Sequence, residues 1–249
     1  MDTTANTPKY YLKLGDDTNR IKAGEKFTFS FIPKLKKDEN SPVILDEIHE
    51  RKAHLIFVSE DLEYFNHIHP EVEQNGKYSV ETSLPFGGKY ILFIEYKPRG
   101  NEKITELINI TVAGKQKPDK IYTLESYTYK GKEYSVELSN NEKVIANLDS
   151  RIFVSIYKDK NEITENQLEN YLGEKAHAVA ISLNDKNFLH VHPMVMGNKL
   201  NLHINFGKPG FYRLWVQFKK DEQLYTSDFV LKAIQADKNE IKANQLNHH

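Results

Sequence analysis

The sequence predicts an all-β protein made of two tandem β-sandwich domains, and three observations lead to this prediction. Short apolar segments rich in Val, Ile, Phe and Tyr recur along the chain. Turn-forming pairs such as Asn75-Gly76 and Gly87-Gly88 separate these segments. The second half of the chain repeats the pattern of the first half. Many short strands at regular spacing are typical of sandwiches, so we expect two immunoglobulin-like domains.

Four strands are expected in each half, because each of these segments alternates or runs apolar over a strand-sized length. In the first half they are residues 27–33 (FTFSFIP), 53–59 (AHLIFVS), 77–84 (KYSVETSL) and 89–96 (KYILFIEY). Their counterparts in the second half are residues 151–157 (RIFVSIY), 177–183 (HAVAISL), 200–206 (LNLHINF) and 211–218 (FYRLWVQF). Helical periodicity is weak, and the best helical candidates are residues 165–173 (ENQLENYLG) and the C-terminal tail.

The duplication also sets the expected domain boundaries. Residues 113–120 (AGKQKPDK) are polar and contain both Gly and Pro, as linkers often do. We therefore expect a first sandwich over residues 1–115 and a second over residues 116–235. Residues 236–249 have few apolar side chains and are expected to form a polar tail.

A motif of nineteen residues occurs once in each half. Residues 52–70 read KAHLIFVSEDLEYFNHIHP, residues 175–193 read KAHAVAISLNDKNFLHVHP, and eight of the nineteen positions are identical. Both copies contain H-x12-H-x-H-P, which supplies His54, His67 and His69 in the first and His177, His190 and His192 in the second. Imidazole is the commonest protein ligand of transition metals, so the motif predicts one three-histidine metal site in each domain.

The spacing predicts that the histidines of the first copy meet on one face of a β-hairpin. A two-residue turn at Glu60-Asp61 would place His54 opposite His67, and opposed side chains share a face. His69 shares that face because it lies two residues from His67. Phe65 shares it too, which indicates that this face leads toward the core.

In the second copy, Asn184-Asp185 is the better turn dipeptide. A turn there would place His177 opposite residue 192, with His190 diagonal to it. All three imidazoles would still lie on one face.

Three imidazoles suit Zn(II), Cu(II), Ni(II) or Fe(II), and we expect copper or zinc. Glu71 and Met194 occupy equivalent positions just after the two motifs and are candidate additional ligands. The thioether of Met194, with Met196 close by, would favour Cu(I). In the alternative reading, the histidines bond to loop carbonyl groups and H-x-H-P is a structural corner.

Composition excludes several other classes of protein. The 34 basic and 35 acidic residues are spread along the chain, so no basic stripe predicts a nucleic-acid partner. No apolar run is long enough to predict a membrane span. Cysteine is absent, which excludes disulfides, thiolate metal sites and cysteine catalysis. The N-terminus MDTTANTPKY lacks an apolar signal region, so we expect a cytoplasmic protein if the chain is complete as written, and a periplasmic or secreted one if a signal peptide was removed.

Residues 170–193 (NYLGEKAHAVAISLNDKNFLHVHP) and 209–220 (PGFYRLWVQFKK) resemble a group of bacterial secreted or lipid-anchored proteins. Residues 54–70 (HLIFVSEDLEYFNHIHP) are similar to the same group. The resemblance implies immunoglobulin-like modules, an envelope location with a possible envelope protein partner, and a heavy-metal context, copper above all. It carries over onto the six motif histidines. The first copy has EIHER at residues 47–51, where the group has its YLG segment.

The function expected first is an extracytoplasmic metal-binding protein that handles or senses copper or zinc. The alternative is an adhesion or scaffold module without metal, in which the equivalent aromatic residues Phe93 and Trp215 would face outward and form an interface. The same two residues could instead pack the two domains together. A metal-dependent enzyme comes third. Three ligands leave an open position for catalysis, but no acidic residue recurs in register with the histidines, and no catalytic residue is assigned.

Overall fold

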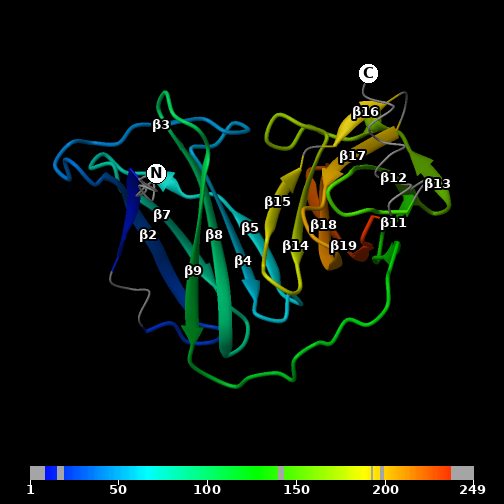
Figure 1. Ribbon diagram of the computed structural model, residues 1–249, viewed down its shortest axis with the longest axis horizontal. Helices are drawn as coiled ribbons and strands as arrows, with labels where there is room; N and C mark the ends of the chain where they lie inside the picture. The colour runs from blue at the N-terminus through cyan, green and yellow to red at the C-terminus, as the bar shows by residue number, and fades with distance from the viewer. Residues whose placement is uncertain (1–8, 16–19, 140–142, 192, 197–198, 237–249) are drawn as a thin grey trace, which may run out of the picture. The chain divides into compact units, whose positions relative to one another are not determined.

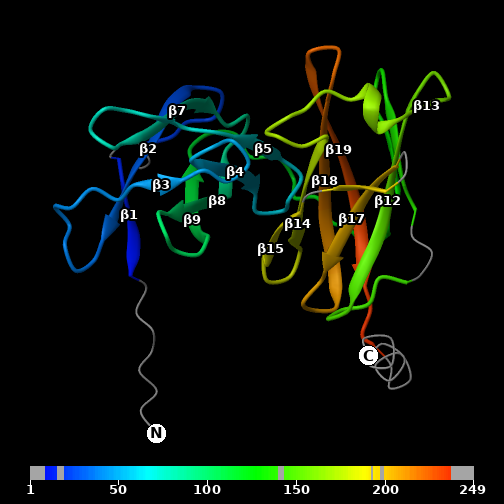
Figure 2. The same ribbon diagram turned by 90° about the horizontal axis from the view of Figure 1, so that it is seen from above.

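The computed structural model describes residues 9–15, 20–139, 143–191, 193–196 and 199–236 (Figure 1). The chain divides into two compact units, residues 1–120 and 121–249. Each unit is a sandwich of two antiparallel β-sheets, which confirms the predicted fold class of two tandem β-sandwich domains. Figure 2 shows the strands of each unit after a quarter turn.

The described residues of the first unit form nine strands in two sheets. One sheet has the order β1-β2-β7-β6, formed by β1 (Tyr10–Leu14), β2 (Lys26–Leu35), β7 (Tyr78–Ser83) and β6 (Glu71–Val72). The other has the order β3-β8-β4-β5, with β9 also paired to β8. Its strands are β3 (Leu45–Asp46), β8 (Gly88–Pro98), β4 (Ala53–Ser59), β5 (Phe65–Ile68) and β9 (Ile104–Val112).

The second unit repeats this arrangement. One sheet has the order β10-β11-β12-β17-β16, with β13 also paired to β12. Its strands are β10 (Thr128–Lys130), β11 (Ser135–Ser139), β12 (Asp149–Lys158), β13 (Asn161–Ile163), β16 (Met194–Met196) and β17 (Lys199–Asn205). The other sheet has the order β15-β14-β18-β19, formed by β14 (Ala176–Ser182), β15 (Phe188–Val191), β18 (Gly210–Lys220) and β19 (Gln223–Ala233).

The core of each sandwich lies between its two sheets and takes every second residue of a strand. In β4, Ala53, Leu55 and Phe57 belong to the core of the first unit. In β14, the equivalent positions Ala176, Ala178 and Ala180 belong to the core of the second unit. Because side chains alternate along a strand, the residues between them, including His54 and His177, face away from the sandwich core.

All eight strands expected from the sequence are present as β2, β4, β7, β8, β12, β14, β17 and β18. The helical candidate over residues 165–173 forms only a 3-10 turn, at Glu165–Gln167. Residue 172 breaks the helical path with a φ of 54°. The tail was the other helical candidate, and residues 237–249 lie outside the described part. No helix among the described residues is long and apolar enough to cross a membrane.

Candidate metal centre

The hairpin formed by β4 and β5 carries the histidines of the first unit. Ile56 pairs with His67 and Leu55 with Ile68, so residue 54 lies opposite residue 69. The predicted pairing of His54 with His67 is therefore wrong by two residues. The connection is longer than the expected Glu60-Asp61 turn, since it spans residues 60–64 and includes Leu62 in the left-handed region, with a φ of 58°. A shift of two residues keeps all three histidines on one face.

The same register recurs in the second unit, where Ala178 pairs with Val191 and Val179 with His190. This is the pairing expected from a turn centred on Asn184-Asp185. Ser182 begins the loop and Asn187 ends it, with the Ser182 amide donating to the Asn187 carbonyl at 3.0 Å.

The face that carries the histidines is the outer face of its sheet. Leu55, Phe57 and Ile68 pack on the core of the sandwich, whereas His54, His67 and Phe65 point the other way. The expectation that this face leads into the core is therefore wrong. His54 and His67 are nevertheless buried, with 0% and 5% of their surface exposed, and His69 is half-buried.

The proline that ends each motif marks a corner between the two sheets. After β5, the chain passes through the buried Pro70 and enters β6, which belongs to the opposite sheet. Glu71 is therefore exposed and pairs with Ser79 of β7. It is not part of the histidine group. Pro193 is likewise buried, between β15 and β16.

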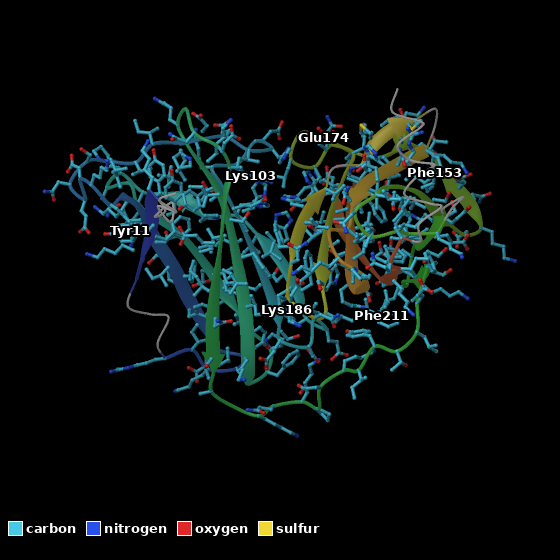
Figure 3. All side chains as sticks on the ribbon, in the orientation of Figure 1. Tyr11, Lys103, Phe153, Glu174, Lys186 and Phe211 are labelled. Atoms are coloured by element: carbon cyan, nitrogen blue, oxygen red, sulfur yellow. The ribbon has the colours of Figure 1, made fainter. Side chains whose placement is uncertain are left out.

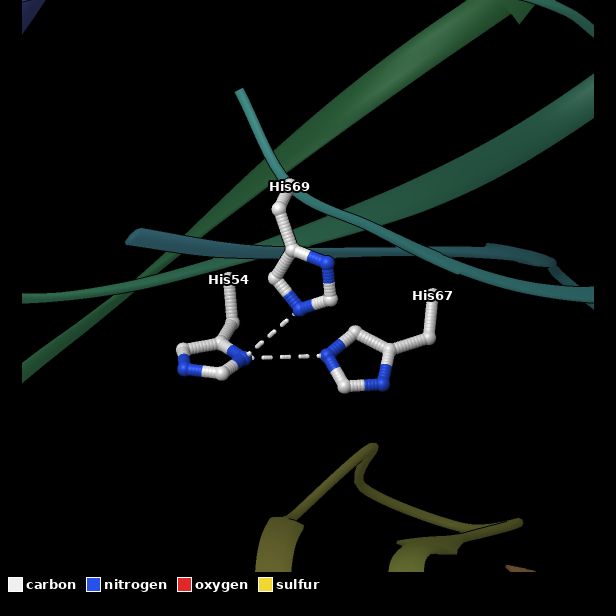
Figure 4. Close-up of side chains that lie close together, drawn as sticks. All are labelled: His54, His67 and His69. Carbon is white, nitrogen blue, oxygen red and sulfur yellow. Dashed lines mark hydrogen bonds between the residues drawn. The ribbon is translucent and has the colours of Figure 1, made fainter. Parts of the chain in front are cut away.

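The three imidazoles of the first unit converge on one point (Figure 4). The Nδ1 atom of His54 lies 3.1 Å from Nε2 of His67 and 3.1 Å from Nε2 of His69. One nitrogen from each ring lies within 4.8 Å of the other two. Tetrahedral coordination with metal–nitrogen bonds of about 2.0 Å separates neighbouring ligand nitrogens by about 3.3 Å, so the cluster matches the size of a metal site.

A tight turn before β4 fixes the orientation of the His54 ring. His49 and Glu50, at its centre, have φ values of 48° and 61°, and the amides of Ile48 and Arg51 exchange bonds with each other's carbonyls. The carbonyl of Ile48 also accepts a hydrogen bond of 2.8 Å from Nε2 of His54. Because a carbonyl only accepts, Nε2 carries a proton, and Nδ1, which holds the lone pair when the ring is neutral, faces His67 and His69.

The second unit has the same turn and the same bond. Leu172 and Gly173 have φ values of 54° and 81°, and Nε2 of His177 donates to the Tyr171 carbonyl at 2.7 Å. Tyr171 is equivalent to Ile48. The EIHER segment of the first unit and the YLG segment of the second therefore form equivalent turns. The rings of His177 and His190 are 5.9 Å apart between centroids. The third expected ligand, His192, lies outside the described residues.

Glu95 is a residue of the site that the sequence analysis missed. It pairs with His54 across β8 and β4 and therefore lies on the histidine face. Its side chain is 1% exposed and forms an ion pair of 2.6 Å with Lys103. A charged residue within the apolar run of residues 89–96 is the signal that could have identified it. The equivalent residue in the second unit, opposite His177, is Gln217.

The other residues named from the sequence lie apart from this centre or differ from expectation. Met194 and Met196 are exposed on β16, an edge strand of the opposite sheet. Phe93 and Trp215 lie on the outer faces of β8 and β18, as expected, and each is only 2% exposed. His203 is a surface residue, 3.6 Å from Asp149.

Solved structures with similar architecture belong to several kinds of protein. A Salmonella alpha-2-macroglobulin mutant aligns with a TM-score of 0.32 and 10% identity over 92% of this chain, which spans only 15% of that protein. An Escherichia coli alpha-2-macroglobulin gives 0.31 and 8% over 92% of this chain and 20% of its own. A segment of chicken tenascin with two fibronectin type III domains gives 0.26 and 12%, covering 90% of this chain and 98% of the segment. Likenesses this distant carry no argument about function.

Sequence comparison gives a more direct result. No curated protein matches the sequence significantly. A family model described as "Domain of unknown function (DUF8832)" matches residues 5–114 and again residues 128–235. The two matches cover the two sandwiches, with one histidine motif in each. The chain therefore belongs to the family defined by this domain of unknown function and contains two copies of it.

Proposed function

We propose that this protein binds transition-metal ions, copper or zinc, through the histidine motif of each domain. The observation that carries the proposal is the convergence of Nδ1 of His54 with Nε2 of His67 and Nε2 of His69, at 3.1 Å for each contact with His54. The bond from His54 to the Ile48 carbonyl supports it. Metal-binding histidines usually donate their other ring nitrogen in this way, which fixes the tautomer and the ring orientation.

Hydrogen bonding alone accounts less well for this geometry. A neutral imidazole has one lone pair, in the ring plane, and Nδ1 of His54 offers it to two neighbouring nitrogens at once. Only one N–H can point along that lone pair. A metal ion between the rings would accept a lone pair from each of the three nitrogens, in a cluster whose size suits metal–nitrogen bonds.

Binding is favoured over catalysis as the role of the metal. Three histidines leave a coordination position open, but hydrolysis would also require a free carboxylate near that position as a general base. The carboxylate closest in register, Glu95, is engaged by Lys103. We therefore assign the protein to metal handling or sensing, in the extracytoplasmic setting that the sequence resemblance implies.

The second domain is included because its local structure repeats the first. His177 donates from Nε2 to the carbonyl six residues before it, as His54 does. His190 occupies the same register position as His67. The proposal is one ion per domain, and His192 supplies the third nitrogen of the second site.

Calorimetric titration of the full chain with Zn(II), and separately with Cu(II), tests the proposal. The terminal His248 and His249 are replaced by Ala in every variant, since a histidine pair at a chain end binds metal adventitiously. We expect two ions per chain in this parent and one in the H67A/H69A variant. H203A is the matched control, because it removes an exposed histidine outside both motifs, and should leave two. Unchanged stoichiometry in H67A/H69A would exclude these histidines as ligands.

One observation favours a second candidate function. The imidazoles of the first unit contact one another and a main-chain carbonyl within hydrogen-bonding distance, so the motif is also able to act as a polar structural corner in a metal-free scaffold or adhesion module. In that case the parent would bind neither Zn(II) nor Cu(II) in the titration, and H67A/H69A would lower the stability of the first domain.

A further inference from the structure

The two histidine sites differ in one buried charge. Glu95 lies opposite His54 on adjacent strands of one sheet, and its side chain is 1% exposed. Opposed residues on antiparallel strands have Cβ atoms about 5 Å apart. The carboxylate therefore lies on the same face as the three imidazoles, in a region from which most water is excluded.

Lys103 forms an ion pair with this carboxylate. Lys103 comes just before β9 and is labelled in Figure 3. Its Nζ atom is 2.6 Å from Oε1 of Glu95, but the lysine side chain is 42% exposed. Water screens an exposed cation more than it screens a buried anion. The carboxylate of this pair is therefore the buried member, and it lies on the side of the histidines.

The second site has no charge at the equivalent position. Gln217 lies opposite His177 as Glu95 lies opposite His54. It is buried and neutral, and its Nε2 donates to Oγ1 of Thr226 at 3.0 Å. Strand β18 thus accommodates Gln where β8 has Glu, within the same fold.

We propose that Glu95 makes the first histidine site selective for a doubly charged ion, such as Zn(II), over the singly charged Cu(I). The inference rests on the proposed metal binding and adds the charge class of the ion to it. Coulomb energy is proportional to the charge of the bound ion. At a fixed position, the carboxylate therefore contributes twice as much to the logarithm of the affinity for a doubly charged ion as for a singly charged one.

The test measures Zn(II) and Cu(I) affinities by competition with chromophoric chelators, without oxygen for Cu(I). The parent is the full chain with H177A, H190A, H248A and H249A, so that only the first site is read. We expect E95Q to weaken Zn(II) binding by about tenfold and Cu(I) binding by about threefold, in the two-to-one ratio of logarithms that charge requires. K103M should act in the opposite direction and tighten Zn(II) binding.

E81Q is the matched control. Glu81 also forms an ion pair of 2.6 Å with a lysine, Lys26, but is exposed and lies on the opposite sheet. The E81Q substitution changes the net charge of the protein by the same amount as E95Q. It should leave the Zn(II) and Cu(I) affinities within about twofold, because exposed charges are strongly screened.

The outcomes separate this inference from the proposed function. A parent that binds neither ion defeats both. A parent that binds, with E95Q losing affinity for the two ions equally, defeats only the inference, since equal losses mean that Glu95 positions the ligands without selecting charge. Should E95Q fail to fold, K103M decides the question: unchanged or weakened Zn(II) affinity in that variant would overturn the inference.

Discussion

His54 uses its two ring nitrogens for two different tasks. Nε2 is held by the Ile48 carbonyl at 2.8 Å, and Nδ1 points at His67 and His69. The His54 ring is therefore already fixed in the folded protein. Binding of a metal ion would not have to restrict its rotation, so the entropic cost of binding would be lower. The duplicated spacing in the sequence identifies the histidines, whereas the choice of nitrogen depends on a carbonyl that no side-chain pattern reveals.

Asp185 carries a prediction about pH at the scale of one residue. It closes the loop between β14 and β15 and accepts from Lys208 Nζ at 2.6 Å. This contact, with Ser182 as the next contributor, lowers the pKa of the Asp185 carboxyl to about 2. A depressed carboxyl pKa stabilises the fold above the unfolded pKa of 3.8, and this stabilisation is lost as the pH falls through the folded value of about 2.

D185N should therefore lower the free energy of unfolding of the second domain at pH 7, by no more than about 1 kcal/mol because the ion pair is partly exposed. The difference from wild type should shrink as the pH falls from 4 toward 2. Trp215 is the one tryptophan of the chain and lies in the second domain, so urea unfolding followed by its fluorescence reports on the right domain. A difference that is constant from pH 7 to pH 2 would contradict the prediction.

At the scale of elements, the tight turn before β4 has the same form as the turn before β14 but a less suitable sequence. The first turn places Glu50 in the left-handed region, with a φ of 61°, where the second has Gly173, with a φ of 81°. For residues other than Gly, this conformation costs about 1–2 kcal/mol of conformational free energy. The turn that positions His54 in the first domain therefore contains a strained residue, Glu50.

The variant E50G should raise the free energy of unfolding of the first domain by about 0.5–1 kcal/mol, since relief of strain exceeds the added freedom of the unfolded glycine. G173A, the reciprocal change, should lower that of the second domain by about 1 kcal/mol. Differential scanning calorimetry measures both. Zn(II) affinity should be unchanged in E50G, because the Ile48 carbonyl keeps its place. Loss of stability in E50G would show that Glu50 contributes a contact worth more than the strain.

These elements show how far sequence reasoning reaches. The strands that bury one or both faces have clear apolar patterns and are predictable. Strand β9 is harder to recognise, because most of its residues alternate between exposed and half-buried. The register of β4 and β5 depends on a five-residue connection in which Leu62 adopts a positive φ, which is unusual for a branched apolar side chain. Glu95 lies on the histidine face because β8 pairs with β4 in the register that places it opposite His54. The spacing of the histidine motif does not contain this information.

At the scale of the whole molecule, the duplication explains both what the two domains share and where they differ. The hairpin register, the tight turn and the bond from histidine to carbonyl recur in both units. The environment does not: the buried Glu95, paired with the exposed Lys103, corresponds in the other unit to the neutral Gln217. The repeated features are those that position the imidazoles, which is expected if the imidazoles share one role.

Ligand-linked stability tests this shared role domain by domain. An ion that binds only the folded state stabilises it by about 2.7 kcal/mol at a free concentration 100 times Kd, which raises the Tm of a domain of this size by on the order of 10 °C. In calorimetry of the parent lacking the terminal histidines, Zn(II) should raise the unfolding transitions of both domains.

In H67A/H69A, Zn(II) should leave the transition of the first domain unmoved and still raise that of the second, which Trp215 fluorescence identifies. H177A/H190A should give the reverse. Each double variant removes two imidazoles from one copy of the motif and leaves the other copy intact. If Zn(II) still raises both transitions when all four histidines are replaced, the stabilisation comes from sites outside the motifs. If each pair of replacements abolishes the shift in its own domain alone, the motif is a metal-binding unit that duplication has placed twice in one chain.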